Sequence, residues 1–61
     1  MTSLNDERVG EWLTFWFKEK VRVHVWNERG WWLCQIGKAR PVRARTVGDA
    51  VCNASILRLG R

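Results

Sequence analysis

Apolar positions in residues 3–20 recur with the period of an amphipathic helix. In "SLNDERVGEWLTFWFKEK" the spacing i, i+3, i+4, i+7 and i+8 is occupied by Val9, Trp12, Leu13, Trp16 and Phe17. Ser3 followed by Asp6 has the spacing of a capping box, so a helix is expected to begin there. Gly10 disfavours a helix interior, and "TFWF" would also suit a strand, which is the alternative for this segment.

Strict alternation in the next segment predicts a β-hairpin. "VRVHVW" places valines on one face of a strand and the side chains of Arg22, His24 and Trp26 on the other. "WWLCQIG" reads as the second strand. Between them, "NERG" has an Asn suited to the start of a type I turn and a Gly suited to a positive φ.

The length of the hairpin loop decides which side chains share a face. A loop with an even number of residues sets Trp26 opposite Trp31 and collects one apolar face, made of Val21, Val23, Val25, Trp32, Cys34 and Ile36. The opposite face then carries Arg22, His24, Trp26, Trp31, Leu33 and Gln35. A three-residue loop would turn Cys34 and Ile36 outward. We therefore predict the even loop, because it alone gives a uniformly apolar face.

The remaining residues predict a short strand and a terminal helix. In "KARPVRAR" Pro41 restricts the strand to a sheet edge, unless Pro41 is the strand's first residue, with Arg43 and Arg45 facing away from the core. Thr46 and Asp49 have capping-box spacing, and Gly60 suits a helix end. The helix has two apolar stripes. The first is Val47, Ala50, Val51, Ala54 and Leu57, and the second is Cys52, Ile56 and Leu59.

These elements predict an α+β fold, a small single domain over residues 1–61. The order is α-β-β-β-α, a three-stranded antiparallel sheet with two helices on one face. A chain of 61 residues buries only about 60% of the surface that its unfolded form exposes. Its five Trp and two Phe are expected to supply much of that burial.

Charge is distributed unevenly along the chain, which is net +5 overall. Residues 1–19 hold two basic and four acidic side chains, a net charge of −2, whereas residues 20–61 hold nine basic and two acidic ones, a net charge of +7. A positive field of this kind attracts polyanions, either nucleic acid or an acidic protein surface.

The residue types needed for catalysis or metal binding do not converge in this pattern. His24 is the only histidine, and strand alternation places it on the face opposite Cys34, which disfavours a Cys–His pair. Cys34 and Cys52 have no partners at the short spacing of zinc sites, and no Gly-rich phosphate loop is present. We expect a protein that is not an enzyme, with no cofactor and no metal.

Localisation is expected to be cytoplasmic, with reduced thiols. The N-terminus "MTSLNDERVGEW" carries acidic residues where a secretory signal carries basic ones, and no apolar run approaches membrane-spanning length. No membrane association is expected.

One set of residues points to binding. The outward sheet face and its rims are expected to present tryptophans among basic side chains, namely Arg22, His24, Trp26, Arg29, Trp31, Lys38, Arg40, Arg43 and Arg45. Bases stack on aromatic rings while Arg and Lys meet phosphates, so nucleic acid, DNA or RNA, is the first hypothesis. Trp and Arg are also enriched at protein interfaces, so a protein partner is the second. In a third interpretation the tryptophans only brace the hairpin and the arginines only confer solubility.

Resemblances to known families extend to element order and type. The order α-β-β-β-α resembles that of double-stranded-RNA-binding domains, and "GWWLCQIG…RARTVGDAVCNA" resembles the β-β-β-α DNA-binding modules of integrases. "TVGDAV" departs from the first family, which has a lysine cluster at that helix start. The length is similar to that of small phage accessory proteins that bind and inhibit host enzymes. A homodimer through Cys52, Ile56 and Leu59 is a further hypothesis.

Overall fold

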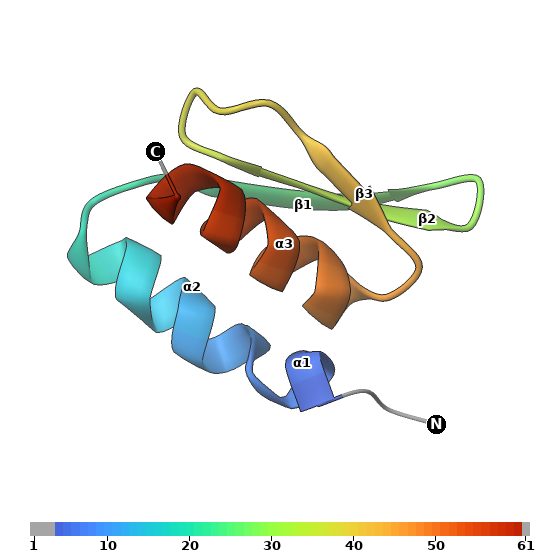
Figure 1. The fold of residues 1–61 in the computed structure, drawn as a ribbon, viewed down its shortest axis with the longest axis horizontal. Helices are drawn as coiled ribbons and strands as arrows, with labels where there is room; N and C mark the ends of the chain where they lie inside the picture. The colour runs from blue at the N-terminus through green and yellow to red at the C-terminus, as the bar shows by residue number, and fades with distance from the viewer. Residues whose placement is uncertain (1–3, 61) are drawn as a thin grey trace.

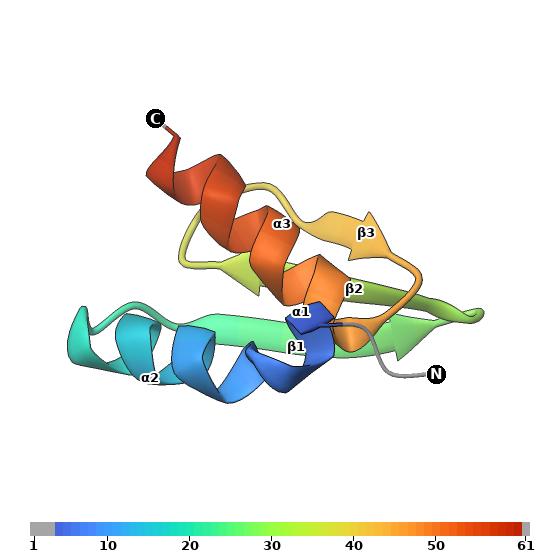
Figure 2. The same cartoon turned by 60° about the horizontal axis from the view of Figure 1, so that its bottom comes forward.

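Three antiparallel strands form a sheet with one face covered by helices, as Figures 1 and 2 show. The computed structural model describes the backbone of residues 4–60 and the side chains from Asp6 onward. The elements are α1 (Leu4–Glu7), α2 (Val9–Lys18), β1 (Val23–Glu28), β2 (Trp31–Ile36), β3 (Val42–Ala44) and α3 (Val47–Leu59). The strand order β1-β2-β3 and the α-β-β-β-α arrangement confirm the predicted fold.

The first predicted helix is divided into α1 and α2 at Arg8, whose φ of −99° and ψ of 1° interrupt the helical geometry. The Asp6 carboxylate of the predicted capping box accepts a 2.6 Å hydrogen bond from the backbone N–H of Gly48, in the first turn of α3. Ser3 lies outside the described residues. Asp6 therefore ties the start of the chain to the start of α3.

Only part of the predicted stripe on α2 is buried. Trp16 is 2% exposed, and Val9 and Trp12 pack partly buried against the core. The inward placement of Leu13 and Phe17 was wrong, since they are 39% and 82% exposed. The reason is that α2 packs mainly against α3 rather than lying flat on the sheet, so a narrower stripe suffices.

The hydrophobic core lies between the sheet and α3. The predicted inward face is confirmed: Cys34 and Ile36 are fully buried, and Val21, Val23, Val25 and Trp32 pack against them. From α3, the small side chains of Ala50 and Ala54 are buried together with Val51. Small residues let the helix backbone approach the strands closely, which produces a dense core in a short chain.

The hairpin loop is even, as predicted, but shorter than expected. Arg29 and Gly30 alone form it, with φ of 54° and 85°, the positive values that a type I′ turn requires. Trp26 therefore pairs with Leu33, and Trp31 pairs with Glu28. The predicted cross-strand pair of Trp26 and Trp31 was wrong. Each face keeps its predicted residues, because a shift by two preserves the side-chain alternation.

The third strand and the last helix follow the prediction closely. Val42 and Ala44 face the core, and Arg43 faces outward. Thr46 Oγ1 accepts a 3.1 Å hydrogen bond from the Asp49 N–H, and the Gly60 N–H closes the helix on the carbonyl of Ile56. The first stripe ends early, because Leu57 is 44% exposed. No helix within residues 4–60 has the length and apolarity needed to cross a bilayer.

Candidate functional site

The face of the sheet that points away from the helices carries most of the predicted site. We call it the outer sheet face. It consists of Arg22, His24, Trp26, Glu28, Trp31, Leu33, Gln35, Arg43 and Arg45. Antiparallel pairing sets these side chains in cross-strand rows, the central one being Trp26, Leu33 and Arg43. The outer sheet face is therefore an ordered array of side chains in rows.

At the hairpin end of this face two guanidinium groups cover one indole ring. The Cζ atoms of Arg43 and Arg45 lie 4.6 Å and 4.2 Å from the centre of the Trp31 ring. Both distances fall within the range of cation–π attraction. Strand register explains the arrangement, because Arg43 pairs with Leu33 and Arg45 follows β3 beside Trp31. We call Trp31, Arg43 and Arg45 the Trp31 cluster.

A second aromatic contact lies along β1. The rings of His24 and Trp26 are 4.7 Å apart with an interplanar angle of 39°. They are two residues apart on one strand, so alternation sets them side by side on the outer sheet face. His24 is exposed and Trp26 is half-buried. Trp26 also lies opposite Leu33, which lengthens the apolar centre of this face.

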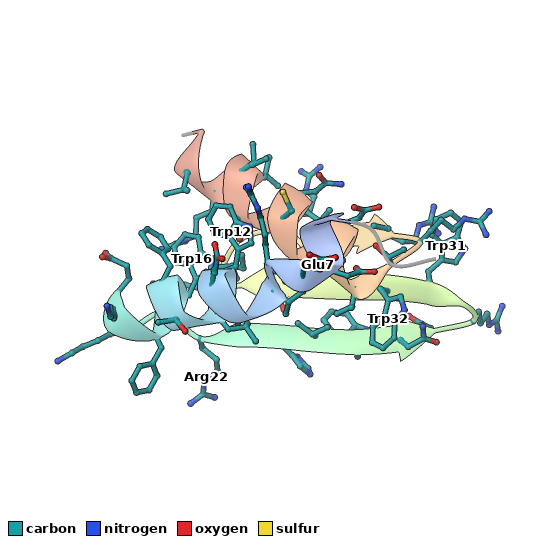
Figure 3. The ribbon with its side chains drawn as sticks, turned by 90° about the horizontal axis from the view of Figure 1, so that it is seen from below. Glu7, Trp12, Trp16, Arg22, Trp31 and Trp32 are labelled. Atoms are coloured by element: carbon teal, nitrogen blue, oxygen red, sulfur yellow. The ribbon has the colours of Figure 1, made fainter. Side chains whose placement is uncertain are left out.

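The remaining predicted residues lie at the other end of the sheet. Figure 3 shows Arg22 and Trp31 at opposite ends of the strands. Lys38 and Arg40, both exposed, lie on the connection from β2 to β3. Gln35 Nε2 donates a 3.0 Å hydrogen bond to the carbonyl of Ala39 and fixes the path of that connection. The predicted site thus spans the length of the sheet, with Arg29 at the hairpin tip.

The basic side chains are concentrated on the sheet side of the molecule. The outer sheet face and its two loops hold six of them, Arg22, Arg29, Lys38, Arg40, Arg43 and Arg45, against one acid, Glu28. The described helical side and its links hold four basic and five acidic side chains. The two sides therefore differ strongly in charge, and the sheet side attracts anions.

The chemistry for catalysis is not assembled among the described residues. His24 points outward, whereas the thiol of Cys34 is fully buried on the opposite face. Burial raises the pKa of the Cys34 thiol to about 11, which keeps it protonated and weakly nucleophilic at neutral pH. Within residues 4–60 no group of three or more metal-ligating side chains is found.

Three residues of this face, Glu28, Leu33 and Gln35, were not among the predicted site residues. Glu28 lies opposite Trp31, and together with Arg29, Leu33 and Arg43 it lines a shallow hollow at the hairpin tip. Leu33 occupies the centre of the face. The Gly30 that follows Arg29 is the sequence signal for a two-residue hairpin loop. That loop places Glu28 opposite Trp31.

Comparison with known proteins gives no match to this chain. No protein-family model, no curated protein and no solved structure matches it. The geometry and charge of the outer sheet face are therefore the observations that bear on function.

Proposed function

We propose that this protein binds nucleic acid through its outer sheet face and is not an enzyme. The observation that supports this most directly is the Trp31 cluster, in which Arg43 and Arg45 are held side by side over one ring. A guanidinium group forms bidentate hydrogen bonds with phosphate oxygens. Two such groups ordered before binding lose less conformational entropy than free side chains on contact with a phosphate backbone.

The charge distribution extends this contact beyond one phosphate. Arg29 lies at the hairpin tip next to the cluster, and Arg22, Lys38 and Arg40 lie at the far end of the sheet. The protein is 30 Å long, so a basic track along the sheet reaches several phosphates of a bound strand. Contacts of this kind position a backbone and carry little sequence information.

Trp31 has a different role here from the stacking platform that its sequence context suggested. Two cations already cover its ring, so we assign it the ordering of Arg43 and Arg45. Trp26 and His24 remain the pair for contact with a base or a sugar.

A salt-dependent titration tests the proposal. Fluorescence anisotropy with labelled duplex DNA, single-stranded DNA and duplex RNA is expected to show binding that weakens steeply with salt. Arg43→Ala with Arg45→Ala is expected to reduce the slope of log affinity against log salt by roughly 2, one unit for each lost phosphate contact.

A matched control removes the same charge from the helical side. Arg8→Ala with Lys20→Gly also removes two positive charges, both from exposed positions, and glycine suits the φ of 60° at Lys20. This control is expected to change the affinity much less. The proposal is wrong if none of the three nucleic acids binds at low salt, or if both double variants lose the same affinity.

A second candidate function is supported by the apolar centre of the same face. Trp26, Leu33 and Trp31 are half-buried and are surrounded by charged and polar side chains, the arrangement of a protein–protein hot spot. In this version the chain is a phage-type accessory protein that inhibits or regulates a host protein by binding an acidic surface of that protein through the outer sheet face. A protein complex that survives nuclease treatment and is lost in Leu33→Asp would favour it over nucleic acid.

A further inference from the structure

The helical side of the molecule carries every large apolar side chain that is exposed, rather than half-buried, among the described residues. These are Leu13, Phe15 and Phe17 on α2, with Ile56, Leu57 and Leu59 on α3. The sheet contributes none of them. A domain of this size needs most of its apolar side chains for its core. A concentration of exposed apolar side chains on one side therefore indicates a contact surface.

Helical periodicity shows which of these side chains share a face of each helix. On α2, Glu11, Phe15 and Lys18 are spaced i, i+4 and i+7, which places them on one face of that helix. On α3, Cys52, Ile56 and Leu59 have the same spacing. Phe15 contacts Trp12 and Trp16 edge to face, at 6.1 Å and 4.9 Å between ring centres. We call Phe15, Cys52, Ile56 and Leu59 the helical strip.

Acidic and basic side chains lie at opposite ends of the helical side. Figure 1 shows α2 and α3 running in the same general direction from N-terminal ends near α1, and Figure 2 shows their C-terminal ends spread apart. The N-terminal end carries Asp6, Glu7, Glu11 and Asp49 with one base, Arg8. The C-terminal end carries Lys18, Lys20 and Arg58 with one acid, Glu19. The helical side therefore has one negative end and one positive end.

From this pattern we propose that the helical strip docks against the helical strip of a second copy of the chain, about a two-fold axis that lies in the plane between the two helical layers and runs perpendicular to the helices. That axis reverses the helix direction in the second copy. Each acidic end then meets a basic end, and Glu11 of each copy faces Lys18 of the other across the apolar centre. A two-fold interface requires a self-complementary surface, and this charge arrangement provides one.

The charge of the outer sheet face also favours a dimer that forms through the helical side. Association through the outer sheet face would bring six basic side chains and one acidic side chain from each copy together, which is repulsive. Docking through the helical side leaves both outer sheet faces exposed on opposite sides of the dimer. The dimer and the nucleic-acid proposal are independent, because sedimentation requires no nucleic acid.

Sedimentation velocity over a wide dilution series tests the dimer. The expected result is a reversible change from the 7.2 kDa monomer to twice that mass as concentration rises. Ile56→Asp with Leu59→Asp is expected to weaken dimerisation by more than about tenfold, because like charges meet near the axis. Both positions are more than half exposed, so the variant is expected to fold. Phe17→Asp, on the other side of α2, is the control and should leave the dimer unchanged.

A charge exchange tests the antiparallel arrangement itself. Glu11→Lys and Lys18→Glu, each alone, are expected to weaken the dimer, while the two together restore it. A monomeric mass at every concentration would overturn the proposal and leave the strip to a different partner. So would a dimer that survives the Ile56 and Leu59 changes, or a double exchange that restores nothing.

Discussion

Trp16 Nε1 donates a 2.9 Å hydrogen bond to Ser55 Oγ, joining α2 to α3 across 39 residues of sequence. Trp16 is 2% exposed and Ser55 is fully buried. The Ser55 hydroxyl in turn donates to the carbonyl of Val51 at 2.7 Å, so both of its hydrogen-bonding functions are used. Figure 3 shows Trp16 between the two helices. This bond fixes how α2 sits against α3.

Loss of this bond should destabilise the fold. Ser55→Ala leaves the buried Trp16 N–H without its acceptor, and we expect the free energy of unfolding to fall by about 1–3 kcal/mol. Trp16→Phe removes the donor and some packing. In urea denaturation the double variant should cost less than the sum of the two single variants. Strict additivity would show that the bond contributes nothing, and Phe17→Ala, at an exposed site, should change stability little.

Asp6 acts as a remote cap of α3. Removal of its carboxylate in Asp6→Ala is expected to lower the free energy of unfolding by about 0.5–2 kcal/mol, because the Gly48 N–H loses its acceptor. Hydrogen exchange at the Gly48 amide should become faster. Glu7→Ala, at the exposed neighbouring position, is the control. Unchanged exchange at Gly48 in Asp6→Ala would contradict the capping role.

The hairpin turn contains one strained residue. Arg29 has a φ of 54°, which Asn tolerates better, so Arg29→Asn is expected to raise the free energy of unfolding by roughly 0.5–1 kcal/mol. Gly30→Ala is expected to lower it by about 1 kcal/mol. No atom lies within 4 Å of an added Cβ there, so only the φ of 85° opposes the substitution. Thermal denaturation of both variants checks the two signs, and equal signs would contradict the turn geometry.

The raised pKa of Cys34 predicts that the protein loses stability at alkaline pH. The Cys34 pKa of about 11 in the folded state lies above the ordinary thiol value of 9.0, so the folded state holds the proton more tightly than the unfolded state. The resulting stabilisation is complete below pH 9 and disappears as the pH rises toward 11. It amounts to about 2–3 kcal/mol. The difference in unfolding free energy between wild type and Cys34→Ala, measured from pH 8 to 11, should shrink by that amount. A constant difference would contradict the shift.

Much of this structure could be predicted from the sequence, because local patterns reflect local physical constraints. Alternation assigned the two faces of the hairpin correctly, since a strand turns successive side chains to opposite sides. Thr46, Asp49 and Gly60 marked the ends of α3, since capping depends on residues close in sequence. The positions of Arg43 and Arg45 on the outer sheet face followed from the same alternation.

The hairpin register was predicted less well, and the reason is specific. The alternation of apolar and polar residues shows whether the hairpin loop has an odd or an even number of residues. A shift of the strand pairing by two residues keeps every side chain on its face, so the alternation does not reveal it. The positive φ of Arg29 and Gly30 selected the shorter loop, and with it the separation of Trp26 from Trp31. The Trp31 cluster depends instead on the pairing of β2 with β3, which sets Arg43 opposite Leu33.

The sequence by itself determined the element order, the inward and outward faces of the sheet and the excess of positive charge in its second half. The tertiary structure decided which distant groups meet: Asp6 with Gly48, Trp16 with Ser55, and Trp31 with Arg43 and Arg45. It also left Phe17 exposed despite its place in the apolar stripe. Such contacts depend on how helices and strands pack against one another, and the sequence pattern within one helix or strand does not specify that packing.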